Sequence, residues 1–135
     1  VRGRDVFEGS SGCTNCHSVD GTGARIAPDL SNIGTMRAAS AIQSSVLSPN
    51  SAMVPLNRPI RAVTNEGLVI NGRRLNEDTY TVQLIDERGR LLSLVKSDLN
   101  DYTVLTTSPM PSYEGRLTPD EVADLVAYLL SLKGF

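Results

Sequence analysis

"GCTNCHS", residues 12–18, contains both cysteines and the only histidine of this 135-residue chain. Cys13 and Cys16 are separated by two residues, and His17 follows directly. This spacing is compatible with part of a zinc site, a redox-active cysteine pair, a plain disulfide, or the covalent attachment of a haem. The fold and the function that the rest of the sequence predicts depend on which of these four the stretch forms.

The four kinds of site make different demands. A structural zinc ion takes four protein ligands, and the chain offers only three Cys and His side chains, so zinc would also need a carboxylate. A thioredoxin-like pair lies where a strand meets a helix, and the residues before Cys13 show no strand pattern. A disulfide between Cys13 and Cys16 leaves His17 without a role. Haem attachment uses all three side chains, because the two thiols form thioethers with the vinyl groups and the next residue binds the iron.

The length and charge of the chain predict one globular domain. Hydrophobic residues make up 40% of the sequence, which is enough for one moderate core. The 13 basic and 15 acidic residues give a net charge of −2, without a basic block typical of nucleic-acid or anionic membrane binding. No apolar run is long enough to cross a membrane, and no signal-peptide core is present, so we expect the chain itself to be soluble. Since it begins with Val1, we expect a mature or excised piece, whose export signal or membrane anchor could lie outside it.

Three segments have helical patterns. Residues 3–10 predict a short helix, and residues 35–47 place apolar side chains at helical spacing before a Ser-Pro-Asn stop. Residues 116–133 are the clearest helix, because Thr118 is a suitable N-cap and Glu121 completes a capping box.

The segment from about 57 to 106 has a period of two, which is typical of strands. Turn signals divide it into five short antiparallel strands, near 59–64, 68–75, 79–86, 90–96 and 102–106. The alternation is similar to that of small SH3-like or Sm-like meanders. Its acidic and basic residues balance, which favours a solvated sheet with one buried face and no further function. A docking platform, or a lid over one edge of a haem, is the functional alternative.

A longer stretch around the cysteines carries a family resemblance. "GRDVFEGSSGCTNCHSVDGTGARIAPDLSNIG", residues 3–34, resembles the start of a bacterial class I c-type cytochrome. The resemblance continues with a middle helix, a Met-Pro element and an amphipathic closing helix, and covers residues 3–56 and 107–135. Two features depart from the family: Phe7 stands six residues before Cys13, where many members have four, and minimal members lack the β-rich block.

This resemblance implies a mainly α fold, in which a few helices surround one haem and a small antiparallel β element is inserted (α+β overall). We therefore expect a single cytochrome c domain over residues 1–135, with the β-rich insertion at 57–106 inside it. A similar insertion is found in a subset of larger bacterial cytochrome domains.

The resemblance also assigns the residues that hold the haem. Cys13 and Cys16 match the thioether positions, and His17 matches the proximal iron ligand. Pro28 matches the proline whose carbonyl accepts a hydrogen bond from the outer nitrogen of the proximal histidine, which orients the ring and strengthens it as a ligand. Leu30 would pack on the haem. The alternatives are a proline that only shapes a loop and an ordinary core leucine.

The second axial ligand has three candidates, because the chain has no second histidine. Met110 lies between two prolines just before the last helix, which is the position and the Met-Pro pairing that the family uses. Met53 is the second candidate, and Met36 is expected in the core. Met110 could also simply pack and leave the iron five-coordinate. Tyr113 and Arg25 are plausible partners of the haem propionates or of the ligand loop.

These assignments predict an electron-transfer protein rather than an enzyme. One c-type haem with its iron, bound by His17 and Met110, would shuttle single electrons between donor and acceptor proteins, and this ligand pair raises the potential relative to two histidines. The resemblance implies a periplasmic or otherwise extracytoplasmic location, where bacteria attach haem covalently. The alternatives are the haem domain of a larger redox enzyme, such as a dehydrogenase, and a haem-based gas sensor with an open iron site.

Overall fold

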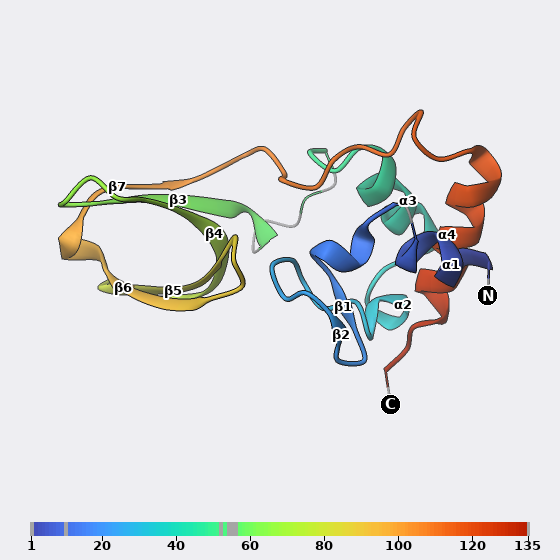
Figure 1. Cartoon of the computed structure of the whole chain (residues 1–135), viewed down its shortest axis with the longest axis horizontal. Coiled ribbons are helices and arrows are strands. Elements are labelled where there is room, and N and C mark those ends of the chain that lie inside the picture. The colour runs from blue at the N-terminus through green and yellow to red at the C-terminus, as the bar shows by residue number, and fades with distance from the viewer. Residues whose placement is uncertain (1, 10, 52, 54–56, 135) are drawn as a thin grey trace. The chain divides into compact units, whose positions relative to one another are not determined.

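The computed structural model describes residues 2–9, 11–51, 53 and 57–134. The chain forms two compact units. The first, called the helical unit, consists of Val1–Ala52 and Met110–Phe135, and the second, called the sheet unit, consists of Met53–Pro109. Figure 1 shows the helices of the first unit and the strands of the second.

The helical unit contains four helices, a 3-10 turn and one small hairpin among its described residues. These elements are α1 (Arg2–Glu8), η1 (Cys13–Asn15), β1 (Ser18–Val19), β2 (Thr22–Gly23), α2 (Ile33–Met36), α3 (Ala39–Leu47) and α4 (Pro119–Ser131). The structure confirms the short helix predicted at 3–10, although Ser10 lies outside the described residues.

Helix α4 confirms the clearest sequence prediction. The hydroxyl of Thr118 accepts a hydrogen bond from the Glu121 amide at 3.2 Å, and the Glu121 carboxylate accepts one from the Thr118 amide at 2.9 Å. These two bonds form the capping box, which satisfies amides that the first helical turn leaves unpaired. The buried face of α4 then packs into the core of the unit with Phe7 of α1 and residues of α3, and the buried members of this core are Phe7, Ile42, Val46, Tyr113, Val122, Leu125, Val126 and Leu129.

The single helix predicted over residues 35–47 is wrong. The chain forms two helices, α2 and α3, because Arg37 has extended backbone angles (φ −140°, ψ 145°) and ends α2. The guanidinium of Arg37 then donates a hydrogen bond to the Ser45 hydroxyl of α3 at 2.7 Å. The side chain thus bridges the break that its own backbone makes.

Helix α2, which includes the first residues of the segment 35–47, contacts the end of α4. The Gly34 amide donates to the Leu132 carbonyl at 2.7 Å, at the end of α4. A Cβ atom on Gly34 would lie 2.1 Å from the Leu130 carbonyl oxygen, so only glycine allows this approach. Helix α2 is therefore fixed against the last turn of α4, and this contact overrides the helical pattern of the segment.

The sheet unit contains one five-stranded antiparallel sheet with the strand order β6-β5-β4-β3-β7. Its strands are β3 (Pro59–Thr64), β4 (Val69–Glu77), β5 (Thr81–Asp86), β6 (Leu91–Val95) and β7 (Leu99–Val104), and a 3-10 turn, η3 (Lys96–Asp98), precedes β7. All five predicted strands are confirmed, with bounds shifted by a few residues. The sheet curves strongly, so that β3 and β7 lie opposite β5 and β6 (Figure 1).

Apolar side chains alternate with polar ones along the strands, and the apolar ones fill the inside of the curved sheet. Ile60, Ala62 and Leu84 are fully buried there, and they pack with Ile70, Leu92, Leu94, Leu99 and Tyr102. The first and last strands are neighbours, since the Leu105 amide donates to the Pro59 carbonyl at 2.8 Å. The start and the end of the chain segment that forms the sheet therefore lie side by side.

The expectation of a mainly α fold is wrong. About 31% of the chain is helical and about 30% is strand. The five strands of the sheet unit account for this share, and one of them, β4, reaches nine residues. The break between α2 and α3 shortens the middle helix as well. Helix and strand thus contribute equally to the molecule.

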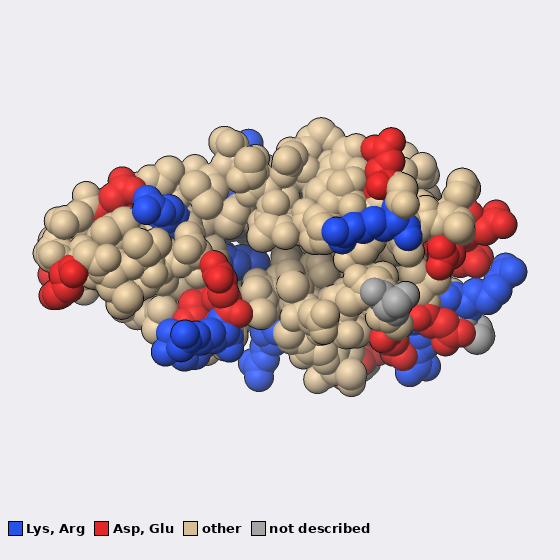
Figure 2. Space-filling view, turned by 45° about the horizontal axis from the view of Figure 1, so that its top comes forward, with Lys and Arg blue, Asp and Glu red and all other residues tan. Residues whose placement is uncertain are grey.

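Charged side chains of both signs are mixed over the surface. Figure 2 shows acidic and basic residues close together on one face, without an extended patch of either sign. Several of them form ion pairs, namely Arg2–Asp124, Arg4–Glu8, Arg61–Asp101, Arg74–Glu77, Arg90–Asp86 and Lys96–Glu77. Within the described ranges, no helix combines the length and the apolar character needed to cross a bilayer.

Candidate functional site

The cysteine motif forms one tight turn. Gly12, with φ of 73°, reverses the chain after α1, and η1 begins at Cys13. The His17 amide donates to the Cys13 carbonyl at 2.9 Å, and the Cys16 amide donates to the same oxygen at 3.2 Å. This turn brings Cys13, Cys16 and His17 together at the surface of the helical unit. Both cysteines are free thiols, with Cys13 half-buried and Cys16 exposed.

A small hairpin follows the motif directly. Strands β1 and β2 pair around Asp20 and Gly21, whose φ angles of 50° and 83° are those of a tight primed turn. Gly23, with φ of 111°, lies so close to the motif that a Cβ atom would be 2.2 Å from the His17 carbonyl oxygen. Sequence reasoning missed this hairpin and Gly23, although the Asp-Gly pair is a strong hairpin signal.

Backbone hydrogen bonds fold the next loop back onto the motif. The Ala27 amide donates to the Cys16 carbonyl at 2.9 Å, and the Leu30 amide donates to the Ser18 carbonyl at 2.9 Å. Pro28, which lies between these two anchors, is thereby held beside His17.

The His17 ring is oriented by this proline. Its Nδ1 atom lies 2.7 Å from the Pro28 carbonyl oxygen. Because a carbonyl oxygen can only accept, Nδ1 carries the proton that is donated, and in the neutral ring Nε2 is then the nitrogen with a lone pair. The ring thus has the tautomer and the fixed orientation that a metal-binding histidine needs.

Three side chains at the border of the core of the helical unit are only half-buried. Cys13, Leu30 and Met110 all pack against the core of the helical unit while part of each remains exposed. Of the other two methionines, Met53 belongs to the sheet unit. Met36 is 71% exposed at the end of α2, so the expectation that it lies in the core is wrong.

The segment after Met110 is tied to the segment before Cys13. Tyr113 is buried, and its hydroxyl donates to the Ser11 carbonyl oxygen at 2.6 Å. The Ser11 hydroxyl lies 3.4 Å from the Cys13 sulfur. No pattern in the sequence singles out Ser11, because its partner is 102 residues away.

Burial controls the ionisation of two groups here. Desolvation raises the pKa of the Cys13 thiol, and the nearby Ser11 hydroxyl opposes this only in part. Desolvation also raises the pKa of Tyr113 above its ordinary value, which already keeps the hydroxyl protonated at neutral pH, so the hydroxyl is a hydrogen-bond donor.

The donor set fits a haem c. Two free thiols separated by two residues can each form a thioether, and the adjacent imidazole has a tautomer suited to iron. Half-buried apolar side chains of the same unit can cover a flat apolar ring system. In the part of the chain that the structure describes, no three Cys, His, Asp or Glu side chains gather as ligands for a bare metal ion.

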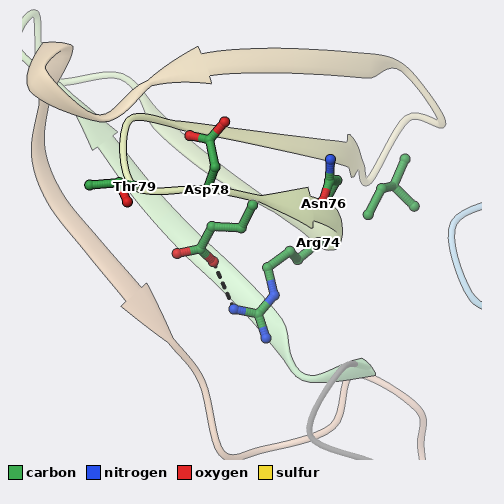
Figure 3. Close-up of a pocket in the computed structure, with 6 residues that line it drawn as sticks. Arg74, Asn76, Asp78 and Thr79 are labelled. Atoms are coloured by element: carbon green, nitrogen blue, oxygen red, sulfur yellow. Dashed lines mark hydrogen bonds and ion pairs between the residues drawn. The ribbon is translucent and has the colours of Figure 1, made fainter.

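A pocket in the sheet unit is lined by none of these residues. It lies at the end of β4 and in the turn to β5, and its lining residues are Arg74, Leu75, Asn76, Glu77, Asp78 and Thr79. Figure 3 shows Arg74 turned toward the carboxylate of Glu77, which it contacts at 2.7 Å. Lys96 Nζ and the Tyr102 hydroxyl also donate to this carboxylate, at 2.6 Å and 2.7 Å, so the cluster joins β4 to η3 and β7.

Comparison with known proteins agrees with the chemistry of the motif. The model of the family described as "Cytochrome c" matches residues 1–78, which include the whole cysteine motif and Pro28. No curated protein gives a significant match to the chain. Because the matched residues make up more than half of its length and hold the two thiols and the oriented histidine, this chain belongs to the cytochrome c family.

Proposed function

We propose that the chain carries one haem c, bound through thioethers to Cys13 and Cys16, with His17 and Met110 as the two axial ligands of the iron. In this proposal it shuttles single electrons between donor and acceptor proteins outside the cytoplasmic membrane. The family itself implies the haem with its iron and a role in electron transport. The residues that bind the haem, the number of haems, the exchange of single electrons with donor and acceptor proteins, and the location are what the proposal adds.

The contact between His17 Nδ1 and the Pro28 carbonyl at 2.7 Å is the observation that carries the proposal. Here the hydrogen bond fixes the tautomer and increases the electron density on the ring, both of which favour binding of iron through Nε2.

Three features support Met110 as the second ligand. It belongs to the same compact unit as His17, it packs against the same core as Cys13, and prolines on both sides restrict its backbone. A thioether suits iron in both oxidation states. Compared with two histidine ligands, a His/Met pair raises the reduction potential of the haem iron. The family match ends at residue 78, so the support for Met110 comes from the molecule itself.

The residues of the chain hold and shield the site rather than react. Cys13 and Cys16 fix the position of the prosthetic group, while Leu30 and the core of the helical unit exclude water from one side of it. When bound, the haem supplies an iron that gains and loses one electron. A fixed ligand set keeps the structural change on electron transfer small, which favours a carrier.

Replacement of each methionine tests the ligand assignment. In Met110→Ala we expect loss of the long-wavelength sulfur-to-iron band of the oxidised protein, a lower potential, and binding of cyanide. Met53→Ala and Met36→Ala are the matched controls and should keep the band. Loss of the band in Met53→Ala but not in Met110→Ala would overturn the assignment.

Covalent attachment is tested separately. Haem should stay with the polypeptide in denaturing electrophoresis and after acid-acetone extraction, at one haem per chain. Release of free haem into the extract would contradict the thioether proposal. For the location, the chain should acquire haem in a bacterial host only when an export signal is fused to it; haem attachment without export would overturn that part.

A further inference from the structure

Tyr113 is hydrogen-bonded through its backbone amide, its carbonyl and its hydroxyl. Its amide donates to the Val46 carbonyl at 3.1 Å, at the end of α3. Its own carbonyl accepts from the amides of Arg116 at 3.0 Å and Leu117 at 3.2 Å, which closes the turn before α4. Its hydroxyl donates to the Ser11 carbonyl at 2.6 Å, and only 8% of the residue is exposed.

The hydroxyl contact connects two segments that are distant in sequence. Ser11 lies two residues before Cys13, and Met110 lies three residues before Tyr113. Three residues of extended chain span at most about 10 Å, so an anchored Tyr113 keeps Met110 within this distance of the anchor. Pro111 further restricts the positions that Met110 can take relative to Tyr113, because the proline ring fixes one backbone angle between the two residues.

We propose that Tyr113 is the positioning residue for the axial methionine. Its hydrogen bond to Ser11 fixes the position of Met110 relative to the cysteine motif that attaches the haem. This inference rests on the proposed role of Met110 as a ligand. In this proposal Tyr113 is not a ligand of the iron; it acts by restricting the Met110 segment.

Other contacts hold this segment in place without the Tyr113 hydroxyl, so the hydroxyl can be removed without unfolding the segment. The Ser112 hydroxyl donates to the Leu47 carbonyl at 2.6 Å, and the Tyr113 amide holds the neighbouring Val46 carbonyl. The Tyr113 ring also packs in the core and lies 5.9 Å from the Arg116 guanidinium. All of these contacts remain in Tyr113→Phe, so this variant should fold and lose only the bond to Ser11.

The experiment measures how often the methionine leaves the iron. Cyanide is added to the oxidised holoprotein of the full chain, and its binding rate reports the opening of the Met110 segment under conditions where the protein stays folded. The loss of one hydrogen bond of ordinary net strength should raise this rate about fivefold in Tyr113→Phe. Tyr128→Phe is the control, because it removes a hydroxyl from a half-buried tyrosine of the same unit, on α4, and should leave the rate unchanged.

Each outcome bears on the inference. A rate in Tyr113→Phe within twofold of the original protein would overturn it, and so would an equal acceleration in both variants, since that would indicate general destabilisation. If the original protein lacks the sulfur-to-iron band, the assignment of Met110 fails and the inference falls with it. A protein with the band and an unchanged Tyr113→Phe rate would overturn the positioning role alone.

Discussion

Gly3 of α1 lies against the backbone of Asp124 in α4 with no space for a side chain. A Cβ atom on Gly3 would be 1.9 Å from the Asp124 carbonyl oxygen and 2.6 Å from Cβ of Tyr128. Next to this point Phe7 is buried, and its ring centroid lies 5.7 Å from that of Tyr128. The two terminal helices of the unit therefore cross at backbone contact, and the core depends on this crossing.

The variant Gly3→Ala should lower the stability of the helical unit. Alanine is the better helix former by about 1 kcal/mol, which alone would stabilise α1. The clash involves backbone atoms that cannot rotate away, so we expect a net loss of about 1–3 kcal/mol. Urea unfolding followed by helical circular dichroism measures the change. An increase in stability would contradict the crossing, because it would mean that α1 can move outward freely.

Gly23→Ala should disturb the haem site. At this position the new methyl group would meet the His17 carbonyl, and the φ of 111° is unfavourable for any side chain. We expect the hairpin and His17 to shift, with a lower yield of covalently attached haem per polypeptide. The matched control is Gly21→Ala, which has a φ of 83° but no atom within 4 Å of the new Cβ. Equal haem yields in both variants would show that backbone strain alone, and not the contact with His17, determines the effect.

The carboxylate of Glu77 should make the sheet unit sensitive to acid. Hydrogen bonds from Lys96, Tyr102 and Arg74 lower the pKa of Glu77 from its ordinary value of 4.5 to about 2. Because the pKa is lower in the folded state, the stabilisation is complete above about pH 4.5 and is lost as the pH falls toward 2. Allowing for solvent screening, the loss is on the order of 1–2 kcal/mol.

Hydrogen exchange of the β4 and β7 amides at pH 6 and pH 2.5 measures this loss. In Glu77→Gln the protection of these amides should be lower at pH 6 and should change less between the two pH values. Glu66→Gln, in the exposed turn after β3, is the control and should behave as the original chain. An unchanged acid response in Glu77→Gln would assign the sensitivity to other carboxylates.

Removal of the sheet should leave a protein that still attaches haem. Cys13, Cys16, His17 and Met110 all lie in the helical unit. The Pro59–Leu105 hydrogen bond shows that the chain enters and leaves the sheet at neighbouring points. A short Gly/Ser linker in place of residues 57–106 can therefore close the chain at a small entropic cost. The ratio of covalent haem to polypeptide should match that of the full chain. A variant without haem would show that the strands form part of the haem pocket, and that treating residues 57–106 as an insertion is mistaken.

Local patterns in the sequence predicted much of this molecule. The five strands follow from a period of two with turn residues between the runs, and α4 follows from its capping box, whose partners are three residues apart. The turn of the cysteine motif is equally local, because its hydrogen bonds join residues three and four apart. Each of these features depends on neighbours in the chain, which the sequence displays directly.

The tertiary structure decided the features that join distant residues. The break at Arg37 arises where α2 meets the end of α4, and the Tyr113–Ser11 bond spans 102 residues. Neither leaves a local signal, because backbone approaches and long-range hydrogen bonds depend on how the helices cross. Local periodicity indicated where helices and strands could form, the five strands included, while packing determined where α2 ended and α3 began.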